Sequence, residues 1–144
     1  MYQKIVLIGN LGRDPEMRYT PTGQPVTTLS LATNRQYTDN SGQQVKETTW
    51  FRVSVWGKQA EACNQYLTKG RPVLVEGRLT PDLNTGGPRI WTKQDGTPGA
   101  SFEVTAQLVR FLPGRADDQT SYPSSEFQSN LSSSNSEIDD DIPF

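Results

Sequence analysis

The sequence contains no histidine among its 144 residues, and this absence excludes several kinds of chemistry. Histidine is the usual general base of catalytic triads and a common zinc ligand. Cys63 is the single cysteine, so the chain can form neither an internal disulfide nor a cysteine-rich metal site. We therefore expect a protein that is not an enzyme, binds no metal and uses no cofactor.

Long hydrophobic runs are also missing. Lys4 is followed by only I-V-L-I, which is too short for a signal-peptide core, and no segment approaches the length of a membrane span. A single cysteine fits a reducing compartment. These features predict a soluble protein of the cytoplasm.

Basic residues are absent from residues 116–144. Residues 1–115 hold all 14 Lys and Arg against nine acidic residues, a formal charge of +5, whereas residues 116–144 hold seven acidic residues, a formal charge of −7. A basic part followed by an acidic part indicates a polyanion-binding domain and a separate interaction arm. The overall charge of −2 conceals this division.

The segment Thr49–Trp56, with the sequence T-W-F-R-V-S-V-W, alternates as a β-strand does. One face would carry the apolar residues Phe51, Val53 and Val55, and the other would carry Trp50, Arg52, Ser54 and Trp56. Indoles beside a guanidinium suit stacked bases and a phosphate backbone. The alternative is that the tryptophans pack against another sheet or a subunit.

Further strands are predicted at residues 4–9, 26–34, 72–79 and 101–112, with turns or a short irregular strand at 10–23. The N-S-G turn signal in Thr38–Val45 predicts a long hairpin, which would bring Tyr37 near Trp50. Residues 80–100 form a long Gly- and Pro-rich arm with Arg89, Trp91 and Lys93 in its middle. For this arm we leave open nucleic-acid binding and local hairpin packing.

The only helical pattern lies in residues 57–70. Ala60, Cys63 and Leu67 would form its buried stripe together with Tyr66, and Gly70 stands where a C-terminal cap belongs. The order of elements is then five strands with one short helix between strands 3 and 4. This is the plan of an all-β, five-stranded OB-fold barrel, which we expect to occupy residues 1–112.

Composition changes at Pro113, where Ser, Asp, Gln and Asn begin to dominate. Such a segment buries too little apolar area to offset its ordering entropy, so residues 113–138 are predicted to be a disordered linker. The last six residues are D-D-D-I-P-F: Asp139, Asp140, Asp141, Ile142, Pro143 and Phe144. Two apolar anchors beside an anionic run predict a peptide ligand for a pocket rimmed by Arg or Lys. The alternative is a solvated charged terminus.

Several of these segments, in this order, resemble the bacterial single-stranded DNA-binding protein family. The matching pieces are I-G-N-L-G-R-D-P-E-M-R-Y, L-A-T-N, T-W-F-R-V-S-V-W-G-K, Y-L-T-K-G, V-L-V-E-G-R-L and D-D-D-I-P-F. The resemblance implies an OB-fold homotetramer of a bacterial, nucleoid-associated cytoplasmic protein. Its function would be sequence-tolerant binding and protection of single-stranded DNA during replication, recombination and repair, with partner enzymes recruited by residues 139–144.

The resemblance also implies roles for individual residues. The DNA-stacking aromatics would be Tyr37, Trp50, Trp56 and Trp91, and the phosphate-binding residues would include Arg18, Arg52, Lys58 and Lys69. From charge and position we add Arg35, Arg71, Arg78, Arg89 and Lys93 to the phosphate-binding set. Two other hypotheses stay open: an adaptor that acts mainly through its acidic tip, and an RNA-binding OB domain, which the tip argues against.

Overall fold

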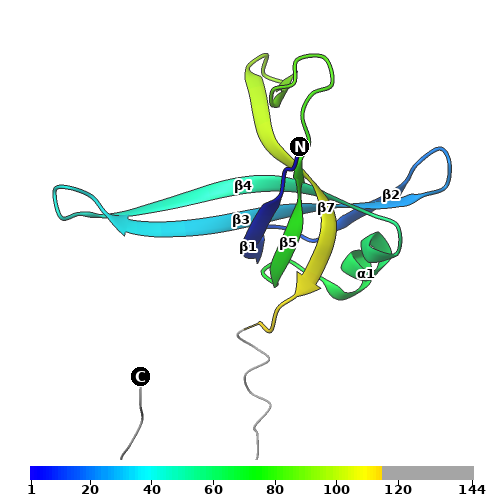
Figure 1. Ribbon diagram of the computed structural model, residues 1–144, viewed down its shortest axis with the longest axis horizontal. Coiled ribbons are helices and arrows are strands. Elements are labelled where there is room, and N and C mark those ends of the chain that lie inside the picture. Colours follow the sequence, from blue (N-terminus) through cyan, green and yellow to red (C-terminus); the bar gives the residue numbers. More distant parts are fainter. Residues whose placement is uncertain (115–144) are drawn as a thin grey trace, which may run out of the picture. The chain divides into compact units, whose positions relative to one another are not determined.

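The computed structural model describes residues 1–114 as one compact unit, and all statements below concern these residues. The predictions for the linker and for the acidic tip lie outside them. The elements, shown in Figure 1, are β1 (Ile5–Leu11), β2 (Glu16–Tyr19), β3 (Pro25–Thr38), β4 (Gln44–Trp56), α1 (Lys58–Tyr66), β5 (Pro72–Leu79), β6 (Arg89–Thr92) and β7 (Pro98–Phe111).

Five of these strands close into a barrel. The neighbours run β1–β5–β7–β4–β3, and β3 then pairs with β1 at Asn10↔Ala32 and Leu11↔Leu31. All pairings are antiparallel except that of β4 with β7, which is parallel. The short strands β2 and β6 pair with β3 and β7 outside this closed path. The predicted five-stranded OB-fold barrel with a helix between its third and fourth strands is confirmed.

The core fills the barrel with the inward side chains of the alternating strands. Its fully buried members include Leu29 and Leu31 of β3, Val53 and Val55 of β4, and Val73, Val75 and Val104 of β5 and β7. Burying each such side chain contributes about 1.5–3 kcal/mol. Phe51 packs partly buried against this cluster, so the predicted inward face of the central strand is confirmed.

Helix α1 covers one end of the barrel, and two details of its prediction were wrong. Ala60 and Cys63 are buried, but Tyr66 is exposed. At 3.6 residues per turn, Tyr66 lies about 60° beyond Cys63, outside the arc that the core covers. The helix also ends at Tyr66 with an extended C-cap residue, so Gly70 is not its cap but a later turn residue with φ of 87°.

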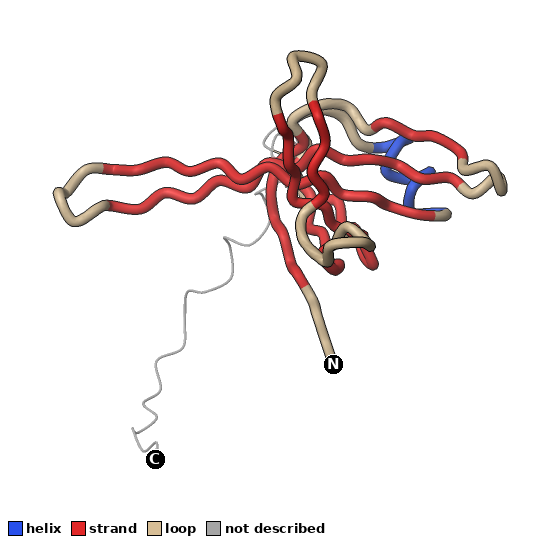
Figure 2. Tube along the Cα trace, turned by 90° about the horizontal axis from the view of Figure 1, so that it is seen from above, coloured by secondary structure: helices blue, strands red, loops and turns tan. Residues whose placement is uncertain are grey.

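Two strand pairs extend beyond the barrel as arms, and we define both by their residues. The first arm, residues 35–47, is the outer part of the β3–β4 hairpin, whose register is unbroken from Val26↔Trp56 to Thr38↔Gln44. It projects from the side opposite β2 and α1 in both views (Figures 1 and 2). The second arm, residues 80–100, contains β6 paired with the start of β7. The local hairpin packing left open for this segment is therefore present.

Candidate nucleic-acid interface

The outward face of β4 carries the row of side chains that the alternation predicts. Trp50 is 51% exposed and Trp56 is 42% exposed, whereas Val53 and Val55 between them are buried. Arg52 lies on the same outward face and is exposed. The two indoles are separated by six residues of strand, which is about 20 Å. This spacing can hold several nucleotides between two stacking positions.

The strand register extends this face across the sheet. Trp56 is opposite Val26, which is itself opposite Arg18 of β2, so Arg18 and Trp56 lie in one cross-strand row. On the other side of β4, Ser54 is next to Thr105, which is opposite Arg78 of β5. Arg18 and Arg78 are both exposed. The structure thus brings three predicted phosphate-binding arginines, counting Arg52, onto the face that carries the indoles.

Three further predicted cations come from the helix and the turn after it. Lys58 begins α1, two residues after Trp56, and is exposed. Lys69 is exposed, and its backbone N–H donates to Oδ1 of Asp14 over 2.8 Å. The carbonyl of Arg71, whose side chain is half-buried, accepts from the N–H of Leu11 over 3.0 Å. Gly70 and Arg71 therefore lie against Leu11 at the end of β1, and the neighbouring Asn10 is in one cross-strand row with Ala32 and Trp50.

Tyr37 lies elsewhere, and the prediction that it is near Trp50 was wrong. Its cross-strand partner is Val45, whereas Trp50 is paired with Ala32. Val45 and Trp50 are five residues apart along β4, which corresponds to about 17 Å, and this odd separation places the two rings on opposite faces. The hairpin prediction located the turn correctly but gave the strands too few residues.

Tyr37 instead belongs to a small cluster on the first arm. The guanidinium carbon of Arg35 lies 4.9 Å from the centroid of the Tyr37 ring. The Tyr37 hydroxyl donates to Oε1 of Glu47 over 3.1 Å. Because Arg35 and Glu47 are opposite each other in the register, the three side chains form one unit. The contribution of Glu47 was missed, since an acidic residue gave no signal for a nucleic-acid site.

The second arm places Arg89 and Trp91 on one face of a two-stranded ribbon. Arg89 is opposite Ser101 and Trp91 is opposite Gly99, two positions along. Trp91 is 42% exposed, and Lys93 lies in the turn, where its N–H donates to the carbonyl of Thr97 over 2.8 Å. The arm therefore brings together one indole and two cations, apart from the row on β4.

Two glycines, Gly12 and Gly99, lie directly against Trp50 and Trp91, and neither contact was predicted. Gly12 fell in the segment predicted as turns or a short irregular strand, and Gly99 fell in the Gly- and Pro-rich arm, where a glycine indicates flexibility or a turn before it indicates a close contact. No signal in the sequence alone distinguishes the two uses.

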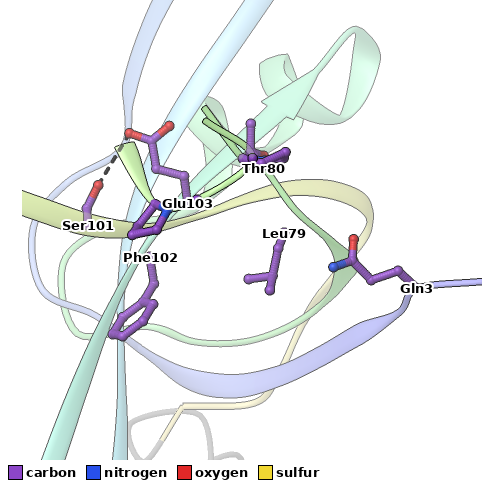
Figure 3. Close-up of a pocket in the computed structure, with 10 residues that line it drawn as sticks. Gln3, Leu79, Thr80, Ser101, Phe102 and Glu103 are labelled. Atoms are coloured by element: carbon purple, nitrogen blue, oxygen red, sulfur yellow. Dashed lines mark hydrogen bonds between the residues drawn. The ribbon is translucent and has the colours of Figure 1, made fainter. Parts of the chain in front are cut away.

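A cavity of about 370 Å³ lies at the base of the second arm (Figure 3). Gln3, Leu79, Thr80 and Glu103 line it together with Phe102, whose ring is 56% exposed and whose centroid lies 5.7 Å from that of Phe51. Among the described residues that line this cavity, none belongs to the predicted stacking or phosphate-binding sets. It is therefore a feature separate from the β4 face.

Within residues 1–114 no group of three His, Cys, Asp or Glu side chains could hold a metal ion. Burial raises the pKa of the Cys63 thiol to about 11, so this thiol stays protonated at neutral pH and is a poor nucleophile. In this part of the chain no helix has the length and apolar character needed to cross a membrane.

The described residues define a class: an OB-fold barrel that displays tryptophans among arginines on an outward face. The model of the Single-strand binding protein family matches residues 2–112, and the chain belongs to this family.

Comparison with individual proteins gives the same family. A single-stranded DNA-binding protein of Wolinella succinogenes is 36% identical over 129 residues, which cover 90% of this chain and 75% of the relative. A structure of Plasmodium falciparum SSB in complex with ssDNA matches with a TM-score of 0.65 and 30% identity, covering 78% of this chain and 97% of that one.

A crystal structure of a deletion mutant of the single-stranded DNA binding protein from Thermus aquaticus matches with a TM-score of 0.62 and 35% identity. The match covers 80% of this chain and 52% of that one, so this chain spans about half of the Thermus protein.

Proposed function

We propose that the chain binds single-stranded DNA, with little dependence on sequence, along the outward face of β4. The observation that carries this proposal is the row of Trp50, Arg52 and Trp56, all exposed on one strand of a barrel of this family. The names of the relatives support the choice of ligand, since they are described as single-stranded DNA-binding proteins and one was solved with ssDNA.

Binding proceeds by electrostatic capture followed by stacking. Basic side chains displace counterions from the strand, and the affinity falls with salt with a log–log slope of roughly −0.7 for each phosphate neutralised. Each base stacked on an aromatic ring adds about 1–3 kcal/mol, so four rings supply roughly 4–12 kcal/mol per subunit before ordering costs. Because stacking uses the faces of bases rather than their edges, the bound sequence matters little.

The two arms carry further rings and cations beyond the β4 row. Arg35 and Tyr37 on the first arm, and Arg89, Trp91 and Lys93 on the second, present rings beside cations as the β4 row does. Arg18, Lys58, Lys69, Arg71 and Arg78 supply the phosphate contacts nearer the barrel. A strand that follows all of these positions wraps around the domain, which agrees with a role in covering exposed DNA.

In the cell this activity protects single strands during replication, recombination and repair in the bacterial cytoplasm. Asp139–Phe144 recruits partner enzymes, since its acidic and apolar residues suit a basic pocket on another protein. The +5 and −7 charges of the two parts of the chain also favour weak competition between the acidic tail and DNA for the basic face. Unchanged DNA affinity at low salt after removal of Ala116–Phe144 would contradict this competition.

Assembly into a homotetramer is part of the proposal. Val6 and Ile8 of β1 are 54% and 61% exposed on the outside of the barrel, where Ile8 is opposite the half-buried Leu74. Apolar side chains gathered on an outer sheet face favour a subunit contact. Sedimentation velocity should show a tetramer for the parent chain and smaller species for Ile8→Lys. A monomeric parent chain would contradict this part.

The deciding experiment is a tryptophan-fluorescence titration of the full chain with oligo(dT), duplex DNA and oligo(U) at several salt concentrations. Strong quenching by oligo(dT), weak quenching by duplex and a negative salt slope are expected. Equal responses to duplex and oligo(dT), or none, would show that the indoles are structural. A stronger response to oligo(U) would favour an RNA-binding domain.

An adaptor function is the second candidate, and the D-D-D-I-P-F ending favours it. Deleting Phe144 should abolish docking of partner enzymes and leave DNA binding intact. The double variant Trp50→Ala with Trp56→Ala should do the reverse. If that double variant binds oligo(dT) as the parent does, the adaptor function alone would stand.

A further inference from the structure

Trp91 and Trp50 each lie against the backbone of a glycine. A Cβ atom added to Gly99 would be 2.8 Å from Cε2 of Trp91 and 3.0 Å from both Nε1 and Cζ2. A Cβ atom added to Gly12 would overlap Cζ3 of Trp50 and lie 2.6 Å from its Cη2. Real Cβ atoms do not approach other atoms this closely, so neither indole could keep its position beside an alanine.

The two contacts differ in their geometry. Cε2 of Trp91 is bonded to both Nε1 and Cζ2. The added Cβ atom of residue 99 would be nearest to Cε2 and equally far from Nε1 and Cζ2, and such a position lies above the plane of the ring. Gly99 therefore faces the flat side of the Trp91 indole. At Trp50 the nearest atoms are two adjacent rim carbons, while Cε3 is already 3.6 Å away. Gly12 therefore meets the edge of the six-membered ring.

The register explains why Gly99 is covered. Trp91 and Gly99 are direct cross-strand partners in the ribbon of β6 and β7. Gly99 is buried although Pro98 and Ala100 beside it are exposed, as expected when an aromatic ring covers a glycine on a neighbouring strand. With one face of the indole on Gly99, Trp91 has a single open face.

We propose that Gly99 is a positioning residue for Trp91: the missing side chain lets the indole lie flat on β7 and present one face to a base. Gly12 has the corresponding role at the ring edge of Trp50. This inference rests on the proposed binding of single-stranded DNA. It predicts that a methyl group at position 99 displaces the indole and weakens stacking, although the substitution changes no charged group.

The first test requires no DNA. In a variant with Trp50→Phe and Trp56→Phe, Trp91 is the only tryptophan and its emission reports its surroundings. Adding Gly99→Ala should shift the emission maximum to the red, because the indole loses its backbone cover. The control is Gly87→Ala in the same arm, since a Cβ there would have only an ordinary contact, 3.7 Å from Oγ1 of Thr85. An unchanged emission maximum in the Gly99→Ala variant would overturn the inference.

The second test measures binding to labelled oligo(dT) by anisotropy in the full chain. Trp91→Ala should weaken binding roughly 5- to 150-fold, as the loss of one stacked base does. Gly99→Ala should weaken it by about 3- to 10-fold, a part of that loss, whereas Gly87→Ala should change it less than about 2-fold. The salt slope should be the same in all three variants, since no cation is removed.

A double-mutant cycle then separates positioning from a general structural effect. If Gly99 acts through Trp91, Gly99→Ala should have no further effect in the Trp91→Ala background. An effect that persists there would overturn the positioning role. If Trp91→Ala itself leaves the affinity unchanged, the DNA-binding role proposed for Trp91 fails. If Trp91→Ala weakens binding and Gly99→Ala does not, only the positioning role fails.

Discussion

The β4 face and the two arms present the same kinds of side chain on different supports. Trp50, Arg52 and Trp56 alternate with core residues of the barrel, so packing in the interior fixes their directions. Tyr37 and Trp91 stand on two-stranded ribbons and are held by local contacts, with Arg35 and Glu47 in one case and Gly99 in the other. The comparison separates rings on a strand of the barrel core from rings on two-stranded ribbons; within the first group, Trp50 also lies against one local neighbour, Gly12.

The largest expected effect comes from removing the rings on β4. Trp50→Ala together with Trp56→Ala should weaken oligo(dT) binding by about 2–6 kcal/mol, because two stacked bases lose their platforms. Trp91→Ala alone should cost about half as much or less. Isothermal titration of the three proteins measures both values. A greater loss from the arm than from β4 would reverse the proposed order of importance.

Substitutions in the barrel and in the second arm should also differ in their effect on the free energy of unfolding. Leu31→Ala should lower the free energy of unfolding by about 2–5 kcal/mol, because Leu31 is fully buried in the barrel. Leu83→Ala, in the loop of the second arm, should change it by less than about 0.5 kcal/mol, since Leu83 is 96% exposed. Urea denaturation measures both. A similar loss in the two variants would mean that the arm is part of the cooperative unit.

The hydrogen bond from the Tyr37 hydroxyl to Glu47 is expected to contribute less to DNA binding than the tryptophan rings do. Glu47→Gln should weaken oligo(dT) binding by no more than about 1 kcal/mol, as expected when a neutral acceptor replaces a charged one. The matched variant Tyr37→Phe keeps the ring and removes the hydroxyl, so it should have a similar effect. Melting temperatures should not change. Tighter binding in the Glu47→Gln variant would show that repulsion of phosphates by this carboxylate outweighs its support of the ring.

The smallest effect concerns pH and the turns of the arms. Hydrogen bonds from the Ser41 side chain and the Gln43 backbone lower the pKa of Asp39, and bonds from the Thr97 side chain and backbone lower that of Asp95. A carboxyl whose folded pKa is depressed stabilises its turn above the unfolded pKa, near 4, and loses this effect as the pH falls through the folded pKa. The protection factors of the Ser41 and Thr97 amides, which are exchange rates relative to an unfolded chain at the same pH, should therefore fall at acid pH while that of Val53 does not. Equal loss of protection at all three positions would instead indicate global unfolding.

Much of the barrel could be predicted because its strands alternate and are closed by turn residues. Residues 72–79 were located to the residue, and the outward row on β4 followed from period-two alternation. The strands of the two arms were harder to predict from alternation and turn residues. The strands continue into residues 35–38 and 44–48, which face water on both sides and so lack alternation, and β6 lies within a stretch dense in turn signals.

Contacts between distant residues were the least predictable part of the site. The prediction that Tyr37 is near Trp50 failed because it needed the hairpin register, which depends on how far the strands extend past the core. The seating of Trp91 on Gly99 depends on the same kind of pairing. Sequence patterns predicted which side chains of β4 face outward, whereas the neighbours of Tyr37 and Trp91 depended on the strand register.

The place of β7 in the sheet has a consequence for the synthesis of the chain. Among the strands of residues 1–114, β7 is the last to be made, yet it lies between β5 and β4 and links these two parts of the barrel. The β3–β4 hairpin is local in sequence and can pair early, whereas closure requires the residues up to Phe111 to have left the ribosome. Until then the edges of β4 and β5 that later pair with β7 are open, and a nascent chain would be most exposed to mispairing just before β7 emerges.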